Sequence, residues 1–362
     1  MTAETKSLVR DEIVAINAYH VPPAQGLIKL DAMENPYTWT EAMREEWAQR
    51  MHNIDVNRYP DPQASALKDA LRSAFTIDSE YGLVLGNGSD ELIQIIATAL
   101  ARPGATVLAP EPSFVMYRMI AVFTGMHYIG VPLDADFNLD LDAMLSAVKR
   151  EQPALTFIAY PNNPTGNLFD VEAIVAIVEA SPGLVVLDEA YFPFAGASFA
   201  DQLSRYPNLV VMRTVSKMGL AGLRLGYLFG GTEWLDQFEK VRLPYNINVL
   251  TQEAATFALE YRHQLDQQTD AICAERQVLS EAISAIEGCE VFPSAANFLL
   301  VRVPVEVCAL HSALRNEGVL IKNLGASEGL LANCVRVTVG KPDENRALVT
   351  AMRQCVSQLP AV

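Results

Sequence analysis

Between about residues 80 and 230, short apolar runs rich in β-branched residues alternate with longer amphipathic stretches. The stretches, such as ELIQIIATAL and VEAIVAIVEA, have the spacing of helices that bury one face. The runs have the length and composition of strands, and they are Tyr81–Leu85, Thr106–Ala109, Leu155–Tyr160, Leu184–Leu187, Val210–Arg213 and Gly226–Phe229. Because this alternation is typical of βαβ units, we predict an α/β fold with a mostly parallel central sheet.

The pattern changes after LPYN, residues 243–246. A helical stretch from about Gln252 to Ile286 is followed by two short strands, NFLLVRV and CVRVTVG, around another helix. This pattern predicts a smaller α+β domain. The first 45 residues are interrupted by prolines, and we expect them to form an arm that completes this domain. The predicted division is a large domain over 46–245 and a small domain made of 1–45 and 246–362.

Composition and charge narrow the class of protein. With 362 residues, of which 50% are hydrophobic and 19% charged, the chain is long enough for two lobes and too apolar to be disordered. Its 27 Lys and Arg against 43 Asp and Glu give a net charge of −16. Such a charge repels nucleic-acid phosphates and anionic membrane surfaces, so neither is an expected partner.

The five cysteines lie in the last quarter of the chain and form no CxxC pair. They predict neither a disulfide framework nor a thiolate metal site, and we expect no metal. The start MTAETKSLVRDE lacks the layout of a signal peptide, and no apolar run approaches the roughly 18 residues that cross a bilayer. The expected location is therefore the cytoplasm.

Small and polar residues follow the ends of four predicted strands, where binding sites of α/β proteins gather. The first group, Gly86 to Asp90, stands before a predicted helix. Small residues there leave backbone N–H groups free to bind an anion, although capping of the helix by Ser89 or Asp90 is an alternative. The glycines match neither the dinucleotide fingerprint GxGxxG nor the Walker pattern.

The second and third groups are PNNPTG and Asp188. Two prolines and a glycine fix a turn after Tyr160 and leave Asn162 at the end of the strand, with a side chain that can donate; a purely structural turn is the alternative. Asp188 follows four apolar residues of a buried strand. A carboxylate there is costly unless it meets a cation or a donor, so we predict a functional role, with helix capping as the alternative.

The fourth group places Ser216 and Lys217 after a strand, with Arg224 seven residues past the lysine. The lysine and the guanidinium can face one anion-bearing ligand, although a lysine in a loop is ordinarily just solvated. Together the four groups supply an amine nucleophile, a carboxylate, hydrogen-bond donors and an anion cradle. Pyridoxal 5'-phosphate (PLP) needs that set of residues.

The segments GNGSDE, YPNNPTG, DEAY and SKMGLAGLRLGY occur in the order found in fold type I PLP-dependent aminotransferases, which this chain resembles. LDAMENPY, NRYPDP, SAANFLLVR and NCVRVTVG are similar to segments of the histidinol-phosphate aminotransferase family. The resemblance covers nearly the whole chain. It implies the PLP-dependent transferase fold type I, with a large cofactor-binding domain and a smaller α+β domain.

The resemblance also implies a role for each matching residue. Lys217 would bond to the cofactor aldehyde and move the substrate's proton, and Asp188 would pair with the pyridine nitrogen. Tyr191 and Asn162 would bind the phenolic oxygen, while Phe114 would stack on the ring. The residues expected at or near the phosphate are Gly88, Ser89, Asp90, Ser216, Arg224 and, from the partner subunit of a homodimer, Tyr59.

Four residues are implied for the substrate, namely Tyr19, Asn35, Lys322 and Arg336. Arg336 would receive its anionic group. Lys322 departs from the family pattern, which commonly has an arginine there, so a point charge replaces a planar fork. The spacing from Lys217 to Arg224 is one residue shorter than in many relatives, a departure that bears on the direction of the Arg224 side chain.

The expected activity is transfer of the amino group of histidinol phosphate to 2-oxoglutarate, a step in histidine biosynthesis. An aromatic amino acid aminotransferase is the first alternative, and a PLP-dependent decarboxylase of a phosphorylated amino acid is the second. A ligand-binding protein that keeps the fold belongs to a different class. A NAD-dependent dehydrogenase would have a similar sheet, but the absence of GxGxxG speaks against it.

Overall fold

A computed structural model describes residues 8–18, 21–325 and 329–362. Its centre is a seven-stranded sheet of order β2-β8-β7-β6-β5-β3-β4. The strands are β2 (Gly82–Gly86), β3 (Thr106–Glu111), β4 (His127–Pro132), β5 (Leu155–Ala159), β6 (Leu184–Asp188), β7 (Leu209–Thr214) and β8 (Gly226–Gly230). β8 is antiparallel to both neighbours and the other pairings are parallel, so the predicted α/β fold with a largely parallel sheet is confirmed.

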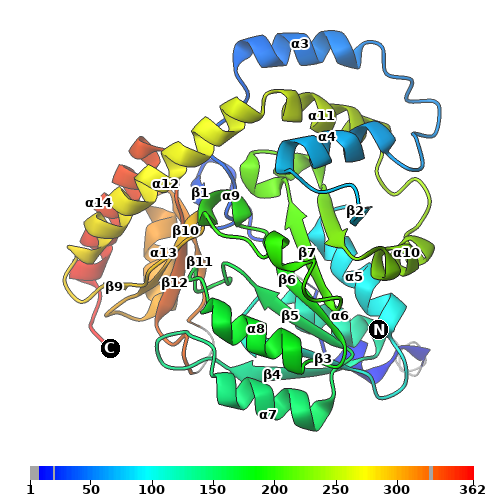
Figure 1. Ribbon diagram of the computed structural model, residues 1–362. Helices are drawn as coiled ribbons and strands as arrows, with labels where there is room; N and C mark the ends of the chain where they lie inside the picture. Colours follow the sequence, from blue (N-terminus) through cyan, green and yellow to red (C-terminus); the bar gives the residue numbers. More distant parts are fainter. Residues whose placement is uncertain (1–7, 19–20, 326–328) are drawn as a thin grey trace.

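Helices cover both faces of this sheet (Figure 1). One face packs against α5 (Ser89–Leu100), α6 (Met116–Thr124) and α10 (Thr232–Val241). The other packs against α4 (Ser65–Phe75), α7 (Leu141–Glu151), α8 (Val171–Ala180) and α11 (Val249–Glu260). Phe157 and Ile158 of β5 are buried against opposite faces, which explains why the central strands read as continuous apolar runs.

A second sheet has the order β1-β11-β12-β10-β9. Its strands are β1 (Ile28–Leu30), β9 (Glu290–Val291), β10 (Phe298–Arg302), β11 (Val319–Asn323) and β12 (Cys334–Thr338). It packs with α12 (Arg262–Ser284), α13 (Val307–Asn316) and α14 (Pro342–Gln358). β1 pairs in parallel with β11, so the segment near the start of the chain adds an edge strand to this sheet. The exact domain boundaries stay a prediction.

The helical stretch expected at 252–286 consists of two helices, α11 and α12, which meet at Tyr261. Ala255 and Ala258 of α11 join the core beneath the large sheet, whereas α12 continues to the second sheet. α3 (Glu41–Met51) lies beside α11 at the edge of the molecule (Figure 1). The remaining short elements are α2 (Asp11–Val14), α9 (Phe192–Ala195), η1 (Ala200–Gln202), η2 (Ser216–Met218) and η3 (Ala221–Leu223).

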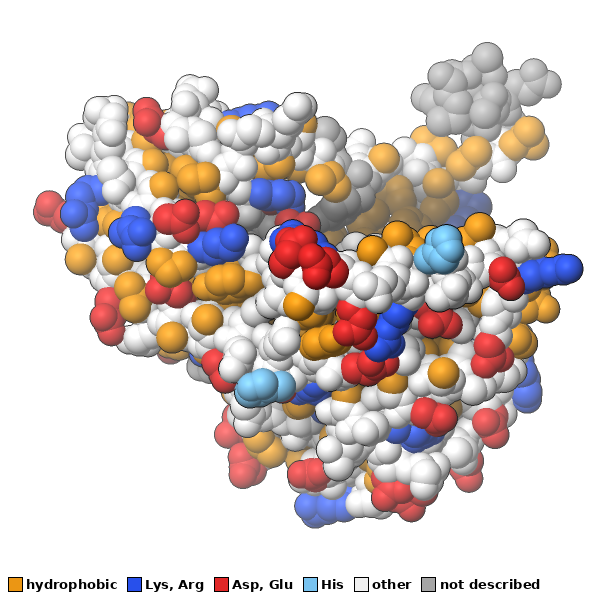
Figure 2. Space-filling view, turned by 90° about the horizontal axis from the view of Figure 1, so that it is seen from above, with side chains coloured by type: hydrophobic (Ala, Val, Ile, Leu, Met, Phe, Trp, Pro, Cys, Tyr) orange, Lys and Arg blue, Asp and Glu red, His pale blue; other side chains and the backbone are white. Residues whose placement is uncertain are grey.

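The surface seen in Figure 2 carries acidic and basic side chains interspersed with one another. No helix within the described ranges is long and apolar enough to cross a membrane. Among the same residues, no cluster of His, Cys, Asp and Glu side chains is arranged to hold a metal ion. All five cysteines are free thiols.

Candidate active site

A cavity of about 390 Å³ lies at the carboxyl ends of β5, β6 and β7. The last residues of these strands, Ala159, Asp188 and Thr214, form part of its wall. Ligands of parallel sheets commonly bind at this edge. The other lining residues are Ala32, Met33, Glu34, Ser89, Asp90, Phe114, Pro161, Asn163, Ala190, Tyr191, Ser216, Lys217, Ala221, Gly222 and Arg224.

Lys217 enters the cavity from η2, the single turn that follows β7. Its Nζ lies 5.6 Å from the centre of the Tyr191 ring. Burial, together with the positive charges of Arg336 and Arg224, lowers the pKa of Lys217 to about 8, against the opposing effect of the carboxylates of Glu34 and Asp90. A larger fraction of this amine is therefore neutral near pH 7, which is the form that attacks a carbonyl.

Asp188 is 4% exposed, and both of its oxygens accept hydrogen bonds. The Tyr117 hydroxyl donates to Oδ2 at 2.7 Å, and the backbone N–H of Ala190 donates to Oδ1 at 3.1 Å. Burial raises the pKa of Asp188 to about 6, against the effect of these two bonds. Tyr117 itself is held by stacking on Phe157, with ring centres 4.5 Å apart. The carboxyl group is thus fixed in direction at the cavity wall.

The turn before α5 forms the predicted cradle for an anion. Gly88 has a φ of +87°, and a Cβ on it would lie 2.7 Å from Nη2 of Arg224. A Cβ on Gly226 would lie 2.7 Å from the carbonyl carbon of Gly88, so a side chain at either position would fill the cradle. Ser89 begins α5, whose free N–H groups and dipole favour negative charge. Arg224 also donates to Asp90 at 3.3 Å across the opening.

The PNNPTG turn presents Asn163 to the cavity rather than Asn162. Asn162 is completely buried behind the wall, where its amide donates to the carbonyl of Pro112 at 3.0 Å and to Thr165 at 2.8 Å. The side chain of Asn162 is therefore not free to donate into the cavity. The sequence prediction that it would donate there is not met by this geometry. Asn163 accepts a 2.6 Å hydrogen bond from Arg336, which places that arginine directly behind it.

Of the substrate residues suggested by the sequence, Arg336 lies behind the cavity wall at Asn163, and neither Arg336 nor Lys322 lines the cavity. Arg336 on β12 is 7% exposed and also donates to the carbonyl of Asp31 at 2.9 Å. Lys322 on β11 pairs with Arg336 in the strand register. Asn35 does not line the cavity, because its amide donates to Gln268 at 3.1 Å. Tyr19 lies outside the described residues.

Tyr59 is not among the residues that line this cavity, and it lies on the surface, where 81% of it is exposed. Its ring stacks on Tyr245 with centres 4.5 Å apart. A role at the cofactor would therefore require Tyr59 to reach the site of another subunit, as the resemblance implies.

Comparison with known proteins identifies the family. The chain matches the aminotransferase class I and II family over residues 25–352. It belongs to this family. It is 54% identical to histidinol-phosphate aminotransferase 2 of Nitrosococcus oceani, over 95% of this chain and 96% of that protein. It is 52% identical to histidinol-phosphate aminotransferase of Chromobacterium violaceum, over 98% and 99%. The crystal structure of histidinol-phosphate aminotransferase from Sinorhizobium meliloti in complex with pyridoxal-5'-phosphate superposes with a TM-score of 0.85, at 26% identity over 97% and 98% of the two chains.

The lining or supporting residues that were absent from the sequence prediction include Glu34, Tyr117 and Asn163. Tyr117 lies in an apolar helix, where an aromatic residue is typical of a core. Asn163 could have been found as the second amide of PNNPTG, since either asparagine fits the spacing. Glu34 lies inside the segment LDAMENPY, in which the sequence prediction assigns a substrate role only to its neighbour Asn35.

Proposed function

We propose that this aminotransferase uses PLP to transfer the amino group of histidinol phosphate to 2-oxoglutarate, giving imidazole acetol phosphate and glutamate. The observation that carries the proposal is one cavity that contains Lys217, Asp188 and an anion cradle around Arg224. Identities of 52–54% to proteins named for this activity, over nearly their full length, support the choice of substrate.

The residues present fit the cofactor. The turn at Gly88, together with Ser89, Ser216 and Arg224, would hold its phosphate. Phe114 would lie against its ring, while Tyr191 and a PNNPTG asparagine would bind its phenolic oxygen; the geometry favours Asn163 over Asn162. When bound, PLP supplies a sink for the electrons of the substrate's Cα–H bond.

The side chains of the chain would then hold and move protons. Nζ of Lys217, with its lowered pKa, would accept the proton from the substrate Cα and later return it, acting as both general base and general acid. Asp188, directed by Tyr117 and the N–H of Ala190, would place its negative charge opposite the ring nitrogen and keep that nitrogen protonated.

The substrate's phosphate would be bound at the side of Arg336 and Lys322, which are cross-strand partners. Histidinol phosphate has no α-carboxylate, so these cations would be available to its phosphate dianion. A charge-assisted hydrogen bond in such a site contributes roughly 1.5 to 3 kcal/mol. Loss of the phosphate should therefore lower kcat/KM by at least about tenfold.

We further propose a cytoplasmic homodimer in which Tyr59 serves the partner's cofactor phosphate. Exposed apolar residues stand close to Tyr59 along the chain and near its stacking partner Tyr245: Val56 is 71% exposed and Leu243 is 70% exposed. Exposed apolar side chains gathered on one surface are typical of an interface between proteins.

The test is a panel of amine donors with 2-oxoglutarate as acceptor. Histidinol phosphate should exceed histidinol, phenylalanine and tyrosine in kcat/KM, and Lys322→Ala should narrow its advantage over phenylalanine. Lys240→Ala, which removes an exposed lysine of α10, is the matched control. It should leave the kcat/KM of histidinol phosphate relative to that of phenylalanine unchanged. A better rate with phenylalanine or tyrosine would favour the aromatic aminotransferase. Release of carbon dioxide without use of an oxo acid would favour the decarboxylase, and binding without turnover the ligand-binding protein.

A further inference from the structure

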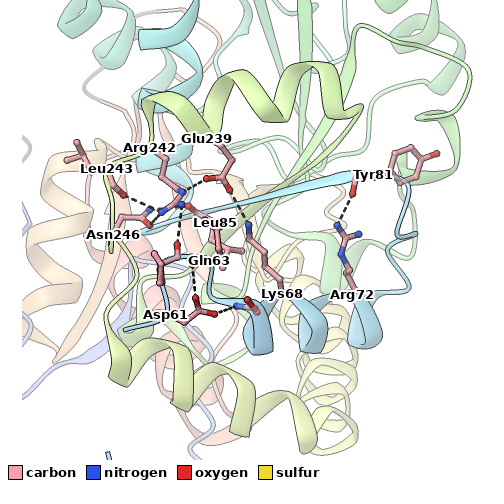
Figure 3. Close-up of polar contacts among 12 residues, drawn as sticks. Asp61, Gln63, Lys68, Arg72, Tyr81, Leu85, Glu239, Arg242, Leu243 and Asn246 are labelled. Atoms are coloured by element: carbon pink, nitrogen blue, oxygen red, sulfur yellow. Dashed lines mark hydrogen bonds and ion pairs between the residues drawn. The ribbon is translucent and has the colours of Figure 1, made fainter. Parts of the chain in front are cut away.

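The segment 242–246 between α10 and α11 connects two loops of the proposed active site. One loop carries the anion cradle and the other carries Tyr59. Figure 3 shows Arg242 beside Glu239, Leu243 and Asn246, with Lys68 on the other side of Glu239. The side chains of Arg242 and Asn246 make the contacts to both loops.

On the cradle side, Asn246 holds the backbone that leads into Gly88. Its amide donates to the carbonyl of Leu85 at 3.1 Å and to Oε2 of Glu91 at 2.8 Å. The same Glu91 oxygen accepts the backbone N–H of Asn87 at 2.6 Å. The residues on both sides of the turn are thus tied to one side chain.

On the other side, Arg242 holds the loop that follows Tyr59. It donates to the side-chain oxygen of Asn246 at 2.9 Å and to the carbonyl of Pro62 at 3.2 Å. Its side chain is 10% exposed, and Glu239 accepts its Nε–H at 2.7 Å. The guanidinium is therefore fixed between the Tyr59 loop and Asn246.

A second connection passes through Tyr245, the residue before Asn246. Tyr245 stacks on Tyr59, and its φ of +58° lies in the left-handed region that bulky residues rarely adopt. Such a conformation persists only where the surroundings determine it. The side chain of Tyr245 stacks on Tyr59, and its backbone continues directly into Asn246. A shift of Tyr59 would therefore displace Tyr245 and, with it, Asn246.

We propose that Asn246 is a positioning residue that couples the Tyr59 loop to the anion cradle. The inference rests on the proposed function, in which the anion is the phosphate of PLP and Tyr59 serves the partner subunit. Because Asn246 donates to the backbone that leads into the cradle and accepts from Arg242, displacement of either loop weakens the bonds to the other. Phosphate binding in one site of the dimer would thus be linked to binding in the other.

The experiment compares the affinity of the cofactor-free protein for PLP and for pyridoxal, which lacks the phosphate. Asn246→Ala should weaken PLP binding about three- to tenfold, the effect of a lost hydrogen bond, and leave pyridoxal binding unchanged. Asn248→Ala is the matched control, since Asn248 caps α11 and its side-chain hydrogen bonds go to Thr251 of the same helix. It should leave the ratio of the two affinities unchanged. Asn246→Ser, a milder variant measured alongside, should change the ratio in the same direction.

The coupling is measured by combining Asn246→Ala with Tyr59→Ala. If the two side chains act through one connection, the loss of PLP affinity in the double variant will be smaller than the product of the single losses. An unchanged ratio of PLP to pyridoxal affinity in the Asn246 variants would overturn the proposed coupling. So would a double variant whose loss of PLP affinity equals the product of the two single losses. Either result would leave the proposed function standing. Failure of the unchanged protein to bind PLP would overturn the proposed function and this inference with it.

Discussion

Asp188 is buried at a cost to the stability of the cofactor-free protein. Burial raises its pKa to about 6 in the native state, above the value of about 3.9 for an exposed aspartate. Below about pH 3 the group is protonated in both the folded and the unfolded state. As the pH rises from about 3 to about 6 the unfolded state loses this proton first, so the free energy of unfolding falls, and about 3 kcal/mol is lost by pH 7.

Asp188→Asn should therefore stabilise the cofactor-free protein at pH 8, by up to about 3 kcal/mol, and make no such difference at pH 4. The same variant should still bind PLP but slow transamination at least about 100-fold, because the ring nitrogen loses its ionic partner. Denaturant unfolding at both pH values measures the first effect, with Asp136→Asn, at an exposed site, as the control. Equal stability changes at pH 4 and pH 8 would contradict this assignment.

Single residues also show where sequence reasoning ends. The apolar run before Asp188 was sufficient to predict a buried carboxylate at the end of a strand, and the structure has it there. The choice between Asn162 and Asn163 depends on the path of the turn, which the order of residues alone does not give. The partnership of Tyr117 with Asp188 joins positions 71 residues apart and leaves no local signal.

At the scale of elements, the strands explain why distant residues meet. Ala159 and Asp188 are register partners in β5 and β6, and Asp188 is the partner of Met212 in β7. Since parallel strands end at the same edge, Asp188 and Lys217 come together although 29 residues separate them in the sequence. On β7, Arg213 donates to the buried Glu189 at 2.9 Å, which fixes the ends of β6 and β7 to each other.

The elements missed by the sequence analysis are those with mixed patterns. β4 reads HYIGVP, is partly exposed at the edge of the sheet, and contains a glycine and a proline, so it lacks the apolar run of a central strand. β11, which carries Lys322, follows α13 after only a short turn. The apolar pattern therefore did not distinguish this strand from the end of the helix. The other six strands of the large sheet were all predicted, within one or two residues at each end.

At the scale of the whole molecule, the proposed dimer places residues of two subunits in each site. In a mixture of Tyr59→Phe and Lys217→Ala subunits, each mixed dimer should contain one site with both residues intact. Random exchange would then restore about a quarter of the sites. Activity is measured after subunit exchange has been verified by mass spectrometry. Mixtures that never exceed the activity of Tyr59→Phe alone would show that Tyr59 does not act across the interface.

The most direct test of the central claim is chemical. Borohydride reduction of the protein with PLP bound should fix the cofactor irreversibly to one lysine, and peptide mapping by mass spectrometry identifies which. We predict that the label lies on Lys217, the lysine that lines the cavity beside Asp188 and Arg224. A label on any other lysine, or none at all, would contradict the assignment of this cavity as the active site.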